Sequence, residues 1–147
     1  MKDRFLSFAI AAVVAGFGGE QVFAAGEKPE SHTAVHELRW VETPFGPEAA
    51  IVAGDFTKGR HITYIKFPAG MTTPLHTHSA DYTGIVVTGV TRHWLPGKPE
   101  TEKLLPAGSH WFIPANAEHV SECLPGVECV MAIHQHDAFD FIAVDIE

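Results

Sequence analysis

The chain has 147 residues, a formal net charge of −8 at pH 7, ten histidines and two cysteines. This length indicates one domain, large enough to bury a core without disulfide or metal staples. The acidic balance disfavours nucleic acid and anionic lipid as partners, because both bind basic surfaces.

Residues 1–24 have the pattern of a bacterial secretory signal peptide. A short charged start with a basic bias precedes an apolar run, Phe5 to Phe17, that is too short for an ordinary membrane-spanning helix. Cleavage is predicted after Ala24, and an uncleaved anchor is the alternative. Cleavage would remove two charges of each sign and keep the net charge at −8. We therefore expect a periplasmic or secreted protein that has no membrane contact after cleavage.

The mature chain is predicted to be a β protein. A polar, flexible leader spans residues 25–35, and residues 36–147 form the domain. Short apolar runs rich in Val, Ile, Thr, Tyr and Phe alternate with Gly and Pro, which is typical of an all-β sandwich or barrel. No long segment shows helical periodicity. The runs lie at residues 49–54, 61–67, 84–90, 110–114 and 128–134, and residues 138–147 could form a closing strand.

The first chemical signal is the His76-Thr77-His78 segment. On an extended strand, residues two apart project from the same face, roughly 7 Å apart along the chain. Two imidazoles on one face can converge on a metal ion. The alternative is a pair of ordinary surface or pocket histidines.

The second signal lies between Gly108 and Cys123. Gly108 opens a predicted strand, Pro114 ends it, and Asn116 suits a left-handed turn position before His119 begins the next strand. A histidine brought back to face the His-x-His pair would complete a site of three imidazole nitrogens. Such a site accepts Fe, Mn, Zn, Ni or Cu, so the sequence does not select the ion.

The two segments resemble the two motifs of the cupin superfamily. The first motif is Gly, five residues, His-x-His, three or four residues, Glu, six residues, Gly, and this chain has Gly70, His76, His78, Tyr82 and Gly89 there. The second is Gly, five residues, Pro-x-Gly, two residues, His, three residues, Asn, matched by Gly108, Pro114, Asn116, His119 and Cys123. The resemblance covers residues 40–145. Together with the export signal, it makes the chain similar to small secreted single-domain cupins. Three residue types depart: Tyr82 replaces Glu, Asn116 replaces Gly, and Cys123 replaces Asn.

The resemblance implies a cupin-type jelly-roll β-barrel whose divalent transition metal ion is held by His76, His78 and His119. Cupins include dioxygenases, isomerases, lyases and non-enzymatic binders, so the fold does not choose the reaction. Cupins with three-histidine iron sites act as dioxygenases. We therefore expect a metal-dependent, dioxygenase-like oxidoreductase that acts on a small molecule. A non-catalytic metal- or ligand-binding cupin and a metal-dependent isomerase or lyase are the alternatives, and a homodimer formed through edge strands is left open.

Tyr82, at the carboxylate position of the motif, is the candidate catalytic residue. It could ligate the metal as a phenolate, donate a hydrogen bond to a bound water or substrate, or only pack in the barrel; we favour the hydrogen bond. The neighbouring Asp81 should point the opposite way, unless a bulge shifts the register. A neutral three-histidine site favours Lewis-acid chemistry or an anionic bidentate substrate such as an enolate.

The remaining cysteines and histidines give weaker signals. A turn separates Cys123 from Cys129, and export favours a disulfide across a hairpin; a free thiol at Cys123 is the alternative. His134 and His136 form a second His-x-His pair without a third ligand spaced to join it. His110 could face the cavity or solvent. The histidines expected at the surface are His32, His36, His61 and His93.

Overall fold

The computed structural model describes residues 30–145, and the predicted signal peptide at residues 1–24 lies outside this range. The domain described below belongs to the compact unit that starts at Thr33. Its helices are two short 3₁₀ turns, η1 (Val35–Glu37) and η2 (Pro99–Thr101). Within residues 30–145, no helix has the length and hydropathy needed to cross a membrane.

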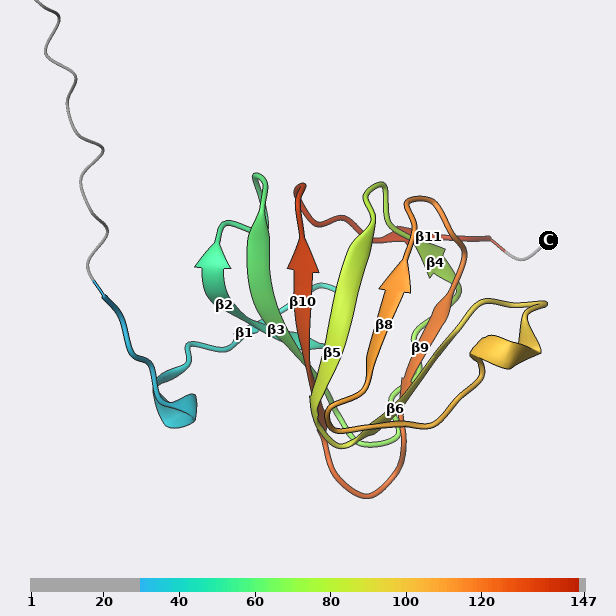
Figure 1. The fold of residues 1–147 in the computed structure, drawn as a ribbon, viewed down its shortest axis with the longest axis horizontal. Coiled ribbons are helices and arrows are strands. Elements are labelled where there is room, and N and C mark those ends of the chain that lie inside the picture. The colour runs from blue at the N-terminus through green and yellow to red at the C-terminus, as the bar shows by residue number, and fades with distance from the viewer. Residues whose placement is uncertain (1–29, 146–147) are drawn as a thin grey trace, which may run out of the picture. The chain divides into compact units, whose positions relative to one another are not determined.

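The described residues form eleven strands in three antiparallel sheets. The largest sheet has the order β1-β2-β3-β10-β5-β8 (Figure 1). Its strands are β1 (Val41–Glu42), β2 (Glu48–Gly54), β3 (His61–Phe67), β10 (Cys129–Gln135), β5 (Tyr82–Thr88) and β8 (His110–Ile113). The second sheet, in the order β7-β6-β9, contains β7 (Leu105–Pro106), β6 (Val90–Trp94) and β9 (Val120–Cys123). The third pairs β4 (His76–Thr77) with β11 (Ile142–Ala143).

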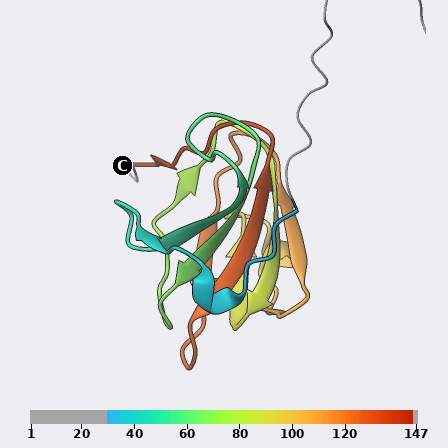
Figure 2. The same cartoon turned by 90° about the vertical axis from the view of Figure 1, so that its left-hand side faces the viewer.

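The chain passes repeatedly between the sheets, as in a jelly roll. After β5 in the largest sheet it enters β6 in the second, returns to the largest sheet at β8, and goes back to the second at β9. Strand β10 then lies between β3 and β5, which precede it by many residues; Figure 2 shows this arrangement from the side. The predicted all-β jelly-roll architecture is confirmed.

The predicted apolar runs correspond to strands, with one informative difference. Residues 84–90 were expected as one run, but the chain leaves the largest sheet at Gly89 and begins β6 at Val90. Gly89 has a φ of 77°, and a Cβ atom there would lie 2.7 Å from Cys129 Sγ and 2.9 Å from the Glu128 carbonyl oxygen. Only glycine fits this close crossing between two sheets.

The core between the sheets contains a buried disulfide. Its apolar cluster comprises Phe67, Tyr82, Ile113, Cys123, Cys129, Met131 and Ile133. Cys123 and Cys129 form the expected disulfide, and both are fully buried. The expected hairpin is not formed, because β9 and β10 belong to different sheets and do not pair. The disulfide therefore ties two sheets together.

Candidate metal centre

Three histidines meet in the interior of the domain, as the sequence predicts. His76 and His119 are cross-strand neighbours: the His76 N–H donates to the His119 carbonyl at 3.1 Å, and the His119 N–H donates back at 3.0 Å. The His78 ring lies 5.0 Å from that of His76 and 5.1 Å from that of His119. One ring nitrogen of each residue lies within 4.8 Å of the others, and no carboxylate of residues 30–145 joins this group.

Local backbone geometry produces this convergence. Asn116 has a φ of 61°, the left-handed conformation that its position in the second motif predicts. Its N–H donates to the His78 carbonyl at 2.8 Å, which ties the turn before His119 to the end of the His-x-His segment. The short strand β11 pairs with the other side of β4. The histidine segment is therefore held from both sides.

A backbone carbonyl fixes the tautomer of each histidine. Each Nδ1 atom is hydrogen-bonded to a carbonyl oxygen: His76 to Pro74 (2.9 Å), His78 to Asp140, and His119 to Ala117 (2.8 Å). A carbonyl oxygen can only accept, so each neutral ring carries its proton on Nδ1 and keeps a lone pair on Nε2. Metal-binding histidines are usually oriented in this way, by a hydrogen bond from the ring nitrogen that does not bind the metal.

Burial keeps these rings neutral. Desolvation lowers the pKa of His76 to about 3 and that of His119 to about 4. It also lowers the pKa of His78, although the Asp140 carbonyl opposes this effect. A metal ion binds only unprotonated imidazole. These rings are already unprotonated at neutral pH, so no proton has to be released when an ion binds. Three buried neutral donors are thus positioned to hold a first-row transition metal ion.

Tyr82 reaches the same centre from the start of β5. Its hydroxyl oxygen lies 3.0 Å from His119 Nε2 and 2.9 Å from His93 Nε2. Burial raises the pKa of the phenol well above its ordinary value, which keeps it protonated. The position that carries a carboxylate in the cupin motif is therefore occupied here by a neutral hydrogen-bonding group. The neighbouring Asp81, which directly precedes β5, is exposed.

Tyr82 links His119 to His93 through hydrogen bonds whose direction follows from the His119 tautomer. Because His119 Nε2 is an acceptor, the single Tyr82 hydroxyl proton is donated to it. His93 Nε2 must then carry its own proton and donate to the Tyr82 oxygen. His93 Nδ1 accepts from the Ser121 hydroxyl at 2.7 Å. The directed chain runs from Ser121 through His93 and Tyr82 to His119.

A stacked indole holds His93 in place. The Trp111 ring stacks on His93 with centroids 4.6 Å apart and planes 23° apart. On its other side it lies over Gly84, where a Cβ atom would come within 2.2 Å of the indole. The Trp111 N–H lies near the Tyr82 oxygen and lowers the pKa of the phenol, against the larger and opposite effect of burial.

The structure corrects two of the predicted surface histidines. His93 is 5% exposed and belongs to the centre, and His61 is 2% exposed at the start of β3. In β6 the inward positions are Thr91 and His93, so a polar alternation replaces the apolar one that would signal burial. The predictions for the other histidines agree with the structure, since the exposed ones include His32 and His36.

The second His-x-His pair does not join the centre. His134 and His136 are both exposed and lie at the end of β10 and just beyond it. His110, for which the sequence allows either the cavity or solvent, is exposed together with Phe112 on β8. Within residues 30–145, the histidine group described above is the one that could hold an ion.

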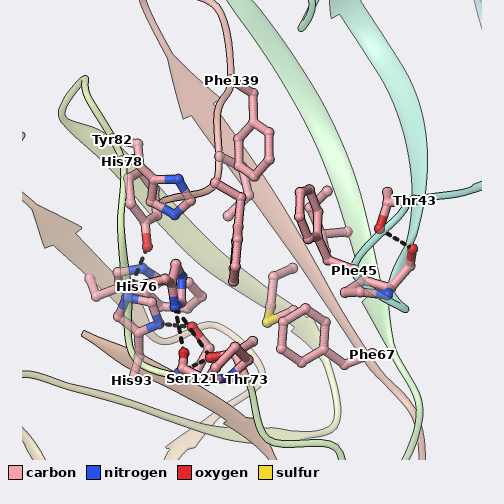
Figure 3. A pocket seen from close by; sticks show the side chains of 17 residues that line it. Thr43, Phe45, Phe67, Thr73, His76, His78, Tyr82, His93, Ser121 and Phe139 are labelled. Carbon is pink, nitrogen blue, oxygen red and sulfur yellow. Dashed lines mark hydrogen bonds between the residues drawn. The ribbon is translucent and has the colours of Figure 1, made fainter. Parts of the chain in front are cut away.

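A pocket of about 690 Å³, including its open mouth, lies beside the histidines. Its polar end, defined here as Thr73, His76, His78, Tyr82, His93 and Ser121, lies opposite Phe45 and Phe67 in Figure 3. The other lining residues are Thr43, Pro47, Ile65, Pro74, Trp111, Met131, Ile133, Phe139 and Phe141. Among residues 30–145, no Lys, Arg, Asp or Glu side chain lines this pocket.

The segment that precedes β11 covers the pocket. Phe139 and Phe141 line it, whereas Asp140, between them, accepts from His78 Nδ1 through its carbonyl. Phe141 stacks on His76 at 4.3 Å and on Phe45 at 4.5 Å. The alternation of Phe139, Asp140 and Phe141 predicts that residues 138–147 form a closing strand, but within the described residues the strand is limited to Ile142–Ala143. Residues 139–141 instead wall the pocket and orient His78.

Solved structures of known proteins share this fold. The chain is similar to KdgF from Halomonas sp., with 25% identity and a TM-score of 0.59 over 74% of this chain and 94% of that chain. An RmlC-like cupin from Ralstonia eutropha JMP134 has 19% identity and a TM-score of 0.61, covering 81% and 79% of the two chains. The polyketide cyclase RemF from Streptomyces resistomycificus has 16% identity and a TM-score of 0.62, covering 81% and 88%. The fold is therefore of the cupin type.

A family model described as "Domain of unknown function (DUF4437)" matches residues 27–126, and the chain belongs to this family. No curated protein matches the chain. The matched range contains His76, His78, His119 and Tyr82 but ends before β10 and the residues that cover the pocket.

Proposed function

We propose that the protein is a metal-dependent enzyme with dioxygenase-like chemistry on a small organic molecule. The observation that carries this proposal is the set of three buried Nε2 lone pairs, each fixed by a carbonyl on Nδ1, beside an apolar pocket. Three neutral imidazoles suit Fe, Mn, Zn, Ni or Cu. When bound, a redox-active ion such as iron would supply electron exchange with dioxygen.

The residues of the chain supply binding, orientation and water exclusion. The apolar walls exclude water from the reacting groups and strengthen polar interactions at the polar end. With His119 Nε2 serving as a ligand, it could no longer accept the Tyr82 proton. His93 would still donate to the Tyr82 oxygen, which would leave the hydroxyl proton to be donated to a substrate oxygen at the polar end. Tyr82 would thereby orient the substrate and stabilise negative charge that develops on it.

The test is metal analysis followed by oxygen consumption. Protein purified from its native source should contain a first-row metal in about equimolar amount. Loaded with that metal, it should consume oxygen with a member of a diketone, thiol and phenol panel. Tyr82→Phe should retain the metal and lose turnover. Metal-loaded protein that consumes no oxygen with any panel member would count against the dioxygenase proposal.

A lyase or isomerase is the second candidate, favoured by the protonated Tyr82 hydroxyl at the polar end. In that case Tyr82 would act as a general acid toward a substrate oxygen. The relative RemF is described as a polyketide cyclase, which supports non-oxidative chemistry on this fold. Turnover under strict anaerobiosis would select this candidate, whereas stoichiometric ligand binding without turnover would select a non-catalytic binding protein.

We also propose export of the protein to the periplasm or beyond. The charged start and apolar run of residues 1–24 support this location, and the Cys123–Cys129 disulfide suits an oxidising compartment. N-terminal sequencing of the protein from its native source should begin at Ala25. A mature chain that begins at Met1, recovered from the cytoplasm with reduced cysteines, would contradict this proposal.

A further inference from the structure

The walls of the pocket restrict the body of its ligand. No charged side chain of residues 30–145 lines the pocket, and beyond the polar end the lining polar groups are the Thr43 hydroxyl and the indole N–H of Trp111, which is buried near the Tyr82 hydroxyl. The Thr43 hydroxyl already donates to the Pro47 carbonyl at 2.7 Å. A charged or hydroxyl-rich ligand body would lose its water here and would find at most the single Trp111 N–H as a partner, which disfavours its binding. The body of the ligand must therefore be apolar.

The same walls favour a flat body. Four phenylalanines and Trp111 line the pocket, so aromatic rings form much of its surface. Phe141 is fixed in a stack between His76 and Phe45, with planes 17° and 25° from theirs. Phe139 lies 5.0 Å from the His78 ring. Aromatic rings in such a frame pack well against another ring in offset or edge-to-face contact.

The polar end favours an anionic group on the ligand. Three neutral imidazoles would leave both positive charges of a divalent ion without a protein carboxylate as ligand. The Asp140 carboxylate lies 4.0 Å from His78 Nδ1, on the side of the ring that faces away from Nε2, and does not line the pocket. Charge in an apolar setting needs a partner. An oxygen anion on the ligand would be such a partner, and the Tyr82 hydroxyl can donate to it.

We propose that the metal-loaded pocket selects a small molecule with a flat, apolar body and a single anionic oxygen group at one end: an aromatic carboxylate, phenolate or enolate. This inference rests on the proposed function, because it requires a divalent ion at His76, His78 and His119. Sugars, dicarboxylates and organic cations are excluded, the first two by the walls and the last by the ion.

Four probe molecules test separately the preference for an anionic head group and the preference for an apolar body. Benzoate has both features, benzamide lacks the head charge, terephthalate adds a charge to the body, and acetate lacks the body. Their affinities are measured by calorimetry on full-length mature protein loaded with Zn²⁺, which does not exchange electrons. Benzoate should bind at least about tenfold more tightly than each of the others. In metal-free protein the advantage of benzoate over benzamide should vanish.

Matched variants assign the contacts. Phe139→Ala should weaken benzoate about fivefold and leave acetate unchanged, because it removes only wall contact. Phe112→Ala is the control, since Phe112 is exposed on β8 and does not line the pocket. Tyr82→Phe should weaken benzoate and acetate alike, by about tenfold, because it removes the hydrogen bond to the head group.

The outcomes distinguish this inference from the proposed function. Failure of the protein to bind Zn²⁺ would overturn the metal centre and the inference with it. If Zn²⁺ binds but benzamide equals benzoate, the anionic head is refuted. If Zn²⁺ binds but terephthalate or acetate equals benzoate, or benzoate does not bind, the apolar body is refuted. In these last cases the metal centre stands and only the selectivity inference falls.

Discussion

The two His-x-His pairs of this chain have the same ring spacing and opposite surroundings. Ring centroids are 5.0 Å apart in His76–His78 and 5.0 Å apart in His134–His136. The first pair is buried, has carbonyl partners on both Nδ1 atoms, and faces a third histidine; the second is exposed. Ring spacing alone therefore does not make a metal site. The first pair combines its spacing with burial, a fixed tautomer and a third donor, and these features make it the candidate metal site.

The largest expected effect is the loss of Zn²⁺ binding when buried histidines are removed. The double variant His76→Ala, His119→Ala should abolish stoichiometric Zn²⁺ binding, because it leaves one imidazole. The double variant His134→Ala, His136→Ala should bind Zn²⁺ as the unmodified protein does. Calorimetry and elemental analysis after dialysis measure both. Equal Zn²⁺ binding by the two double variants would show that the buried group is not the site.

The buried histidines can be predicted from the sequence because the residues that indicate them lie close together along the chain. The spacing of Gly70, His76 and His78, with His119 after the Asn116 turn, predicts three histidines on facing strands, and the structure places them there. The strands were predictable for the same reason, since apolar runs and turn residues follow one another along the chain.

The missed features depend on contacts between distant segments. His93 is buried on β6 because Trp111, eighteen positions later, stacks on it, and no apolar alternation marks its strand. The carbonyl that orients His78 belongs to Asp140, which is 62 positions away. The cysteine pair was predicted, but its placement between two sheets follows from the crossover of the chain at Gly89. A single sequence carries no local signal of such partners.

Acid should destabilise the metal-free protein through the buried histidines. Their pKa values in the folded state, about 3 for His76 and about 4 for His119, lie below the ordinary value of 6.5. At pH values between the folded-state pKa values and 6.5, the unfolded chain therefore binds more protons than the folded protein. The free energy of unfolding should be highest above pH 6.5 and should fall as the pH drops toward 4, by an amount on the order of a few kcal/mol.

Urea unfolding of metal-free protein at several pH values between 7.5 and 4 measures this slope. The variant His76→Leu should show a shallower slope, because one buried imidazole no longer takes up a proton on unfolding. The double variant His134→Ala, His136→Ala is the matched control and should keep the slope. A free energy of unfolding that is constant over this range would contradict neutral burial of the three rings.

The smallest expected effect concerns the direction of one proton within the buried centre. His93→Phe keeps a ring against Trp111 but removes the N–H that donates to Tyr82. Metal content should be unchanged, and affinity for an anionic ligand should fall about threefold to tenfold, the range expected for the loss of one hydrogen bond between neutral groups. Tyr82→Phe should give a similar loss, and the double variant should add little to it, since both act through one hydroxyl.

A spectroscopic signature separates this positioning role from a structural one. Long-range ¹⁵N–¹H spectra of the metal-free protein should show His93 with its proton on Nε2, and His76, His78 and His119 with theirs on Nδ1. His110→Phe, on the exposed side of β8, is the control and should alter neither tautomers nor ligand affinity. A His93 proton on Nδ1 would reverse the chain, so that Ser121 accepts and Tyr82 donates toward His93. Tyr82 would then have no proton to offer a substrate, and its replacement of the motif carboxylate would have to be explained by packing alone.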